Sequence, residues 1–224
     1  MRAAGTMMRL LFLNPNSTQA MTDSMVEVAR NALPGTELLG WTNHDGPAAI
    51  QGPEDGAAAV AGLMALLPKA QAAAVDAIVI GCFDDTGLDR LRDAAHCPVI
   101  GIGQAAMALA ALHGGRFGIV TTLDVSVPVI RANVAAYGHA DACMAVVASG
   151  IPVLDVEMGG PQVRDRLSRV IADTARGGAR AIVLGCAGMS ALRPELGRDT
   201  DAVLVDGVVA AAHLAQVMAL TIRD

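Results

Sequence analysis

Short apolar runs, many of them β-branched, alternate along the chain with longer Ala-rich stretches whose apolar residues recur at helical spacing. The runs predict strands near residues 9–13, 37–41, 77–80, 99–102, 117–120, 144–148, 181–184 and 203–205. The stretches between them predict helices near residues 19–32, 56–70, 87–95, 104–112, 127–137, 161–176, 191–196 and 208–221. Because strands and helices alternate and the strands are apolar throughout, the pattern predicts an α/β fold with parallel sheets covered on both faces.

One strand segment occurs twice in the chain. Residues 77–82 read AIVIGC and residues 181–186 read AIVLGC, so five of the six positions are identical at an offset of 186 − 82 = 104. The strand ends at Asn14 and Thr121 form a second pair, at an offset of 121 − 14 = 107. A repeat of fixed period reuses one structural unit. The sequence therefore predicts two pseudo-symmetric Rossmann-like lobes, each with a mainly parallel four-stranded sheet.

Composition narrows the classes of partner. The net charge is -6 and no basic run is present, which leaves no electrostatic footprint for a nucleic acid. No apolar stretch reaches the roughly 20 residues that span a bilayer, and residues 1–9 lack the apolar core of a signal peptide. We therefore expect a cytoplasmic protein that binds a small molecule, and neither a nucleic acid nor a membrane.

The cysteines are the candidates for chemistry. They lack the C-x-x-C motif and the paired spacing of zinc ligands, and they are predicted to be free thiols. Cys82 and Cys186 each follow the end of a repeated strand, where ligands of open α/β sheets bind and where a helix N-terminus lowers the pKa of a thiol. A single cysteine is usually an inert core residue. The matched pair favours two reactive thiolates, one from each lobe, whereas Cys97 and Cys143 keep the structural interpretation.

Five blocks in order along the chain carry a family resemblance: NPNST at 14–18, GPAAIQG at 46–52, CFDDTGL at 82–88, TTL at 121–123 and LGCAGM at 184–189. Together they resemble the aspartate/glutamate/hydantoin racemase superfamily, and within it the hydantoin and allantoin racemases. The resemblance implies a racemase without a cofactor, an active site between the two lobes, and a homo-oligomer. It also implies that the C-terminal helix returns to the first lobe, which then comprises residues 1–103 and 207–224, with residues 104–206 forming the second.

The residues around the cysteines bear on the substrate. In amino-acid racemases of the superfamily each cysteine is usually followed by Asn and Thr, whereas here Phe83-Asp84-Asp85 and Ala187-Gly188-Met189 follow. Two acidic side chains, with no Arg or Lys in these loops, disfavour a dicarboxylate. A neutral cyclic ureide, such as a 5-substituted hydantoin or allantoin, needs no cationic clamp. Within the five blocks we expect Cys82 and Cys186 to be catalytic, and the substrate to contact Asn14, Asn16, Ile50, Phe83, Asp84, Thr121, Thr122, Ala187 and Gly188.

Several alternatives stay open. A decarboxylase or a cis-trans isomerase of the same superfamily uses similar scaffolding, and two α/β lobes also build non-catalytic proteins that bind small molecules. Asp84 and Asp85 are either helix caps or acids, and Thr122 is either a cap or a substrate contact. The histidines show no metal-binding spacing, so no metal is expected. Residues 101–106 fit the dinucleotide fingerprint G-x-G-x-x-A, but no acid stands at the ribose position after the next strand.

Overall fold

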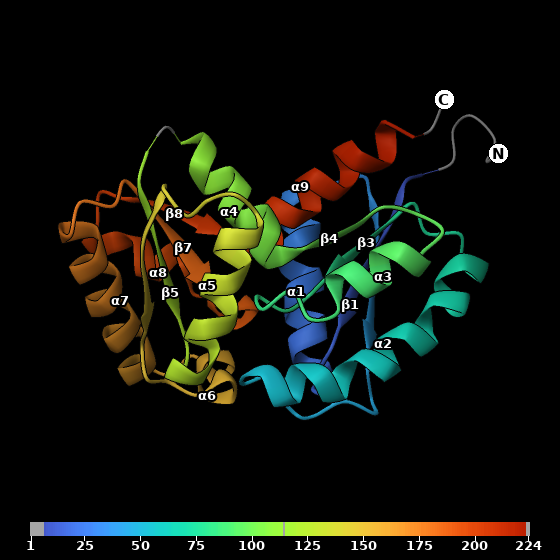
Figure 1. The fold of residues 1–224 in the computed structure, drawn as a ribbon, viewed down its shortest axis with the longest axis horizontal. Coiled ribbons are helices and arrows are strands. Elements are labelled where there is room, and N and C mark those ends of the chain that lie inside the picture. The colour runs from blue at the N-terminus through green and yellow to red at the C-terminus, as the bar shows by residue number, and fades with distance from the viewer. Residues whose placement is uncertain (1–6, 114, 223–224) are drawn as a thin grey trace.

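Two four-stranded parallel sheets form the framework of the computed structural model, which describes residues 7–113 and 115–222 (Figure 1). The first has the order β2-β1-β3-β4, with β1 Arg9–Asn14, β2 Glu37–Thr42, β3 Ala77–Ile80 and β4 Val99–Gly101. The second has the order β6-β5-β7-β8, with β5 Phe117–Thr121, β6 Cys143–Ala148, β7 Ala181–Gly185 and β8 Val203–Asp206. The shared order and the parallel pairing confirm the predicted α/β fold of two pseudo-symmetric lobes.

The helices follow the predicted alternation with two differences. Their bounds are α1 Gln19–Ala32, α2 Pro53–Ala72, α3 Leu88–Ala94, α4 Ile102–Leu112, α5 Val127–Ala136, α6 Val153–Met158, α7 Pro161–Arg176, α8 Arg193–Leu196 and α9 Gly207–Leu220. Helix α6 was not predicted, because six residues are too few to show a helical period. Helix α8 is one turn, shorter than the helix predicted over 191–196.

The two sheets share a middle layer of helices. Helices α1, α4, α5 and α9 lie between the sheets, whereas α2 and α3 cover the outer face of the first sheet and α7 that of the second (Figure 1). One buried apolar cluster runs through this layer, from Phe12 and Val79 of the first sheet to Phe117 and Val183 of the second. The two lobes therefore share one hydrophobic core. This core fixes the ends of their strands on either side of the interface between the lobes, which we call the seam.

Helix α9 follows the last strand of the second sheet, yet it packs on α1, β3 and β4 of the first. Its start comes very close to the start of α4: a Cβ at Gly207 would lie 2.6 Å from the carbonyl oxygen of Ile102. The lobe boundaries at 103/104 and 206/207 stay a prediction, and residues 1–6 and 223–224 of the first lobe lie outside the described residues. None of the described helices is long and apolar enough to cross a membrane.

Helix α9 begins directly where β8 ends, and a carboxylate closes its N-terminus. Oδ1 of Asp206 accepts a hydrogen bond from the backbone N–H of Val208 at 2.8 Å and another from the hydroxyl of Ser190 at 2.8 Å. This is a conventional N-cap, in which a side-chain oxygen satisfies amide groups that have no partner within the helix.

Helix α4 has the same kind of cap, but the carboxylate comes from elsewhere in the chain. The position equivalent to Asp206 is Gly101, at an offset of 206 − 101 = 105. Asp85, from the loop after β3, accepts hydrogen bonds from the backbone N–H groups of Gly103 at 2.9 Å and Gln104 at 2.7 Å. At Gly101 a Cβ would lie only 1.9 Å from Oδ1 of Asp85, so the glycine leaves room for that carboxylate.

This cap accounts for the dinucleotide-like residues 101–106. The backbone amide groups at the start of α4, which would bind a phosphate in a nucleotide site, already bind the carboxylate of Asp85. The glycines of the fingerprint are needed for this internal contact, which argues against the nucleotide interpretation. Asp85 does cap a helix, as one of the open alternatives held, but it caps α4 and not the helix that follows it in sequence.

Candidate active site

Each of the two repeated cysteines follows the carboxyl end of one of the two central strands of its sheet. Cys82 follows β3 and Cys186 follows β7, and each is preceded by a glycine. A Cβ at Gly185 would lie 2.6 Å from the carbonyl oxygen of Val120 on β5, and one at Gly81 would lie 2.7 Å from the side chain of Met25. The glycines therefore let the chain pass tightly packed neighbours just before each thiol.

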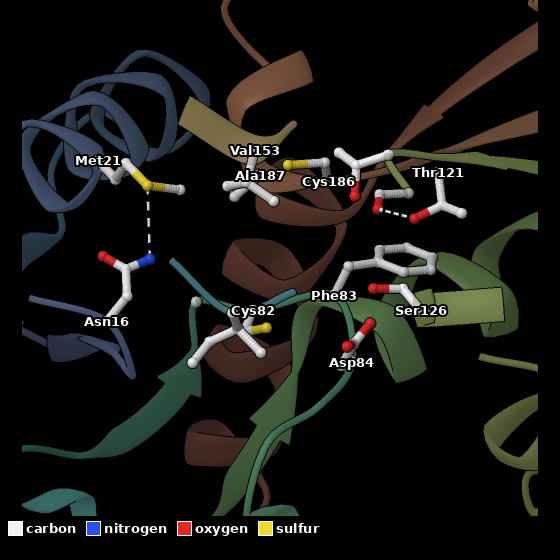
Figure 2. Close-up of a pocket in the computed structure, with 14 residues that line it drawn as sticks. Asn16, Met21, Cys82, Phe83, Asp84, Thr121, Ser126, Val153, Cys186 and Ala187 are labelled. Carbon is white, nitrogen blue, oxygen red and sulfur yellow. Dashed lines mark hydrogen bonds between the residues drawn. The ribbon is translucent and has the colours of Figure 1, made fainter. Parts of the chain in front are cut away.

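A single cavity at the seam between the lobes receives both thiols. It encloses about 370 Å³ of empty space, including the part that opens to solvent. Figure 2 shows Cys82 and Cys186 on opposite walls, with Val153 and Ala187 beside Cys186, and Phe83 and Asp84 on the side of Cys82. The lining residues are Asn16, Met21, Ile50, Gly81, Cys82, Phe83, Asp84, Thr121, Thr122, Ser126, Val153, Gly185, Cys186 and Ala187.

Most of the residues expected from the sequence line this cavity, and two do not. Asn14 is fully buried behind the cavity, where its amide donates to the side chains of Asn16 at 3.0 Å and Thr22 at 3.0 Å. Gly188 also lies outside the lining, although its backbone N–H donates a hydrogen bond to the thiol of Cys186. Both residues thus support groups that face the cavity.

Five lining residues were not expected: Met21, Gly81, Ser126, Val153 and Gly185. The two glycines stand directly before the cysteines in the repeated segments, so the repeat itself was a signal for them. Met21 lies in the first turn of α1, Ser126 in the short 3-10 helix Asp124–Ser126, and Val153 at the start of α6. They reach the cavity only through the packing of the lobes, and no local pattern marks them.

The hydroxyl groups of the two predicted threonines are placed differently. The Thr121 hydroxyl donates to the carbonyl oxygen of Gly185 at 3.0 Å, so its only proton is already used. Thr122 is 3% exposed, and its carbonyl oxygen accepts hydrogen bonds from Ser149 and Gly150 of the loop after β6. Of the two side chains, therefore, Thr122 is the one whose hydroxyl makes no such bond to the neighbouring strand.

The loop after Cys82 is held by a helix of the opposite lobe. Asn133 of α5 donates to the carbonyl oxygen of Asp84 at 3.0 Å, and the Tyr137 hydroxyl donates to Asp85 at 2.9 Å. Burial raises the pKa of Asp85 to about 7, against the lowering effect of the hydrogen bonds from Tyr137, Gly103 and Gln104. Of the two acids beside Cys82, only Asp84 faces the cavity.

The pKa values of the two thiols are raised, whereas the sequence predicted lowered values. Burial raises the pKa of Cys186 to about 12, with the Gly188 N–H lowering it and the charges of Glu157 and Asp84 raising it further. Burial and the charge of Asp84 likewise raise the pKa of Cys82 far above its usual range, against the lowering effect of the nearby Thr86 hydroxyl. Desolvation outweighs the helix ends, so the expectation of resting thiolates is wrong: both groups are thiols at neutral pH.

This protonation state gives a testable result. We expect the rate of alkylation of Cys186 by iodoacetamide to rise by about tenfold per pH unit from pH 7 to pH 10, because the thiolate fraction grows in that proportion below the pKa. Mass spectrometry after peptide digestion measures the rate at each cysteine, and the urea-unfolded protein supplies the unperturbed profile. A plateau of the folded-state rate below pH 8.5 contradicts the raised pKa.

The cavity wall contains no Lys, Arg or His among the described residues. Within that same part of the chain, no cluster of three or more His, Cys, Asp and Glu side chains is arranged to hold a metal ion. The ionisable groups of the cavity wall are the two thiols and the carboxyl group of Asp84, and they lie among apolar side chains such as Ile50 and Phe83. Such a site suits proton transfer on a small, uncharged molecule.

Comparison with known proteins shows to which family the chain belongs. The family model described as Asp/Glu/Hydantoin racemase matches residues 10–215. A hydantoin racemase of Rhizobium meliloti is 42% identical over 214 residues, covering 94% of this chain and 88% of that protein. Among solved structures, an allantoin racemase from Klebsiella pneumoniae has a TM-score of 0.90 at 36% identity, covering 96% of this chain and 88% of its own.

A second solved structure, an allantoin racemase from Pseudomonas fluorescens, has a TM-score of 0.88 at 30% identity, covering 96% of this chain and 92% of its own. The family match spans nearly the whole chain and includes both repeated strands and both lobes. These relatives support a racemase function, and hence an isomerase. On this evidence the chain belongs to the Asp/Glu/hydantoin racemase family.

Proposed function

We propose that this protein racemises a cyclic ureide, a 5-substituted hydantoin or allantoin, by a two-cysteine proton exchange that needs no cofactor. The observation that carries the proposal is the placement of Cys82 and Cys186 on opposite walls of one small cavity (Figure 2). Inversion at carbon requires one group that removes the proton from one face and a second that returns a proton to the other. A matched thiol from each lobe meets this requirement.

The proposed step begins with one cysteine as thiolate and the other as thiol. The thiolate sulfur takes the proton from ring carbon 5, and the electron pair of the C–H bond moves into the neighbouring carbonyl to form an enolate. The opposite thiol then gives its proton to the other face of carbon 5, and the electron pair returns from the enolate oxygen. The product has the inverted configuration, and the two cysteines have exchanged protonation states, ready for the reverse reaction.

The negative charge that develops on the enolate oxygen needs hydrogen-bond donors. Thr122 is the side-chain candidate, since the Thr121 hydroxyl donates to Gly185 instead. Backbone N–H groups at the strand ends are the other candidates, as in the oxyanion holes of acyl-transfer enzymes. Each well-placed donor is worth about 3 to 4 kcal/mol of transition-state stabilisation in enzymes where this was measured by mutation.

The raised pKa values of the thiols bear on the mechanism as well. The resting cysteines are thiols. The base that takes the proton from carbon 5 is therefore either the small fraction of thiolate in the free protein or a thiolate that forms as the substrate binds. Two donors that lower the pKa are already in place: the Asp84 N–H at Cys82 and the Gly188 N–H at Cys186. A hydantoin suits a weak base, because its enolate is delocalised into the ring.

The size and charge of the cavity support a ureide as substrate. With no cation on its described wall, the cavity offers nothing to neutralise the carboxylate of a free amino acid. A five-membered ureide ring is uncharged and carries N–H and C=O groups that backbone and side-chain groups can satisfy. The hydantoin and allantoin racemases among the relatives point to the same class of substrate.

Proton NMR in D2O with single enantiomers of a 5-substituted hydantoin and of allantoin tests this function. We expect the protein to replace the carbon 5 proton with deuterium and to convert each enantiomer into the racemate, both well above the rate without protein. Circular dichroism follows the loss of optical activity in parallel. If neither compound exchanges or racemises, while free aspartate or glutamate does, the proposed substrate class is wrong. Release of carbon dioxide from an added carboxylated analogue, without racemisation, would point to a decarboxylase instead.

A further inference from the structure

Asp84 is the acidic group on the cavity wall, and one of its oxygens has no partner. Its Oδ2 atom is buried and makes no hydrogen bond within the described part of the chain. Burial raises the pKa of this carboxyl group to about 6, against the lowering effect of the Ser126 hydroxyl of the opposite lobe, and the two side chains point toward each other in Figure 2. A buried acceptor without a donor is costly, so this oxygen calls for a donor that the free protein does not supply.

The side chain is held in place from both sides of the seam. Asn133 donates to the carbonyl oxygen of Asp84, and the preceding Phe83 is 3% exposed and packs in the shared core. The next residue, Asp85, is fixed by the N-terminus of α4. Asp84 is therefore a rigid acceptor rather than a mobile surface acid, and it has no cation near it on the cavity wall.

The charge of Asp84 acts on both thiols. It raises the pKa of Cys82 and, from across the cavity, that of Cys186. A carbon atom held between the two sulfurs consequently has its own substituents close to this carboxylate. In a ureide ring the reacting carbon bears a carbonyl on one side and a ring N–H on the other. A carboxylate repels the carbonyl oxygen and accepts a hydrogen bond from the N–H, so the ring can lie in only one sense.

We propose that Asp84 determines specificity by accepting a hydrogen bond from the ring N–H that is bonded to the reacting carbon. This inference rests on the proposed function and narrows it: the substrate class is a ring with an acylated N–H next to the carbon that inverts. Ser126, which faces the carboxyl group from the opposite lobe, positions it. Rings with a methylene group in place of that N–H leave Oδ2 unpaired and bind weakly.

Two achiral probes separate this binding role from the proton exchange. Hydantoin carries the ring N–H, and succinimide has a methylene group at the same place with otherwise matching ring atoms. We expect the wild-type protein to bind hydantoin about 30 to 100 times more tightly than succinimide, measured by competition against racemisation and by NMR titration. In Asp84→Ala the preference falls to about threefold or less, and in Asp84→Asn, which keeps the shape, it falls by at least about tenfold.

Asp89→Asn is the matched control. Asp89 lies in the exposed first turn of α3, and its substitution removes the same charge at a position close by in sequence. It should leave the hydantoin preference at the wild-type value. An unchanged preference in both Asp84 variants, or a wild-type preference of threefold or less, overturns the role of Asp84 while leaving racemisation of ureides intact. Failure of hydantoin to bind the wild-type protein at all overturns the proposed substrate class, and the role of Asp84 with it.

Discussion

The Cys82→Ser and Cys186→Ser variants are expected to lose racemisation of a 5-substituted hydantoin by about 1000-fold or more, each as severely as the other. A serine hydroxyl occupies nearly the same space as a thiol but is a far weaker acid, and its alkoxide is not available at neutral pH. Because inversion needs both walls of the cavity, the loss of either thiol stops it. For the same reason the double variant should be little worse than either single one.

The direction of residual proton exchange should differ between the two variants. A variant that keeps one thiol can still remove a proton from the face of carbon 5 that this thiol contacts, and can return a deuteron to the same face. We therefore expect slow deuterium uptake without inversion from one enantiomer in Cys82→Ser, and from the other enantiomer in Cys186→Ser. Proton NMR in D2O together with chiral chromatography measures uptake and inversion separately.

Cys143→Ser serves as the control, because Cys143 lies at the start of β6, away from the cavity, where its thiol donates to the carbonyl oxygen of Ala145. It should racemise at the wild-type rate. If either cavity variant racemises within about tenfold of the wild type, the two-base mechanism does not operate. Equal deuterium uptake from both enantiomers in one variant would show that the remaining thiol does not face a single side of the ring.

The second large effect concerns stability at the start of α4. We expect Gly101→Asp to lower the free energy of unfolding by about 3 to 5 kcal/mol, since the new side chain overlaps the buried carboxylate of Asp85. A Cβ alone would come within 1.9 Å of Oδ1 of Asp85, and the added carboxylate brings a like charge to the same helix end. Urea unfolding followed by circular dichroism measures the loss.

The second lobe shows how this loss should be reversed. There Asp206 stands at the strand end and accepts a hydrogen bond from Ser190, which comes from the loop after Cys186 as Asp85 comes from the loop after Cys82. The double variant Gly101→Asp, Asp85→Ser copies that arrangement into the first lobe. It should be more stable than either single variant, with Asp85→Ser alone losing the cap of α4. Additive losses in the double variant would show that the two helix ends are not equivalent.

Much of the architecture could be predicted from the chain alone. The apolar runs located every strand of the described residues, because a strand buried on both faces leaves a continuous signal in sequence. The repeat of residues 77–82 at 181–186 identified two equivalent lobes and paired Cys82 with Cys186, since a duplicated unit places equivalent residues at equivalent strand ends. The homo-oligomer and the cytoplasmic location stay predictions.

Other features depended on contacts between segments far apart in sequence, which no local pattern encodes. Met21, Ser126 and Val153 line the cavity because α1, the turn before α5, and α6 meet at the seam. The helix that Asp85 caps could not be predicted from the sequence either, because this helix begins 17 residues later, 102 − 85 = 17.

The protonation of the cysteines was decided by the tertiary structure as well. The sequence places each thiol near a helix start, which lowers a pKa, whereas folding places both thiols between two lobes and removes most of the water around them. Solvation depends on the whole surrounding volume, and a chain pattern reports only on neighbours along the backbone. The sequence by itself thus determined which two sulfurs correspond and predicted a site between the lobes, and the packed lobes alone determined that both sulfurs remain protonated in it.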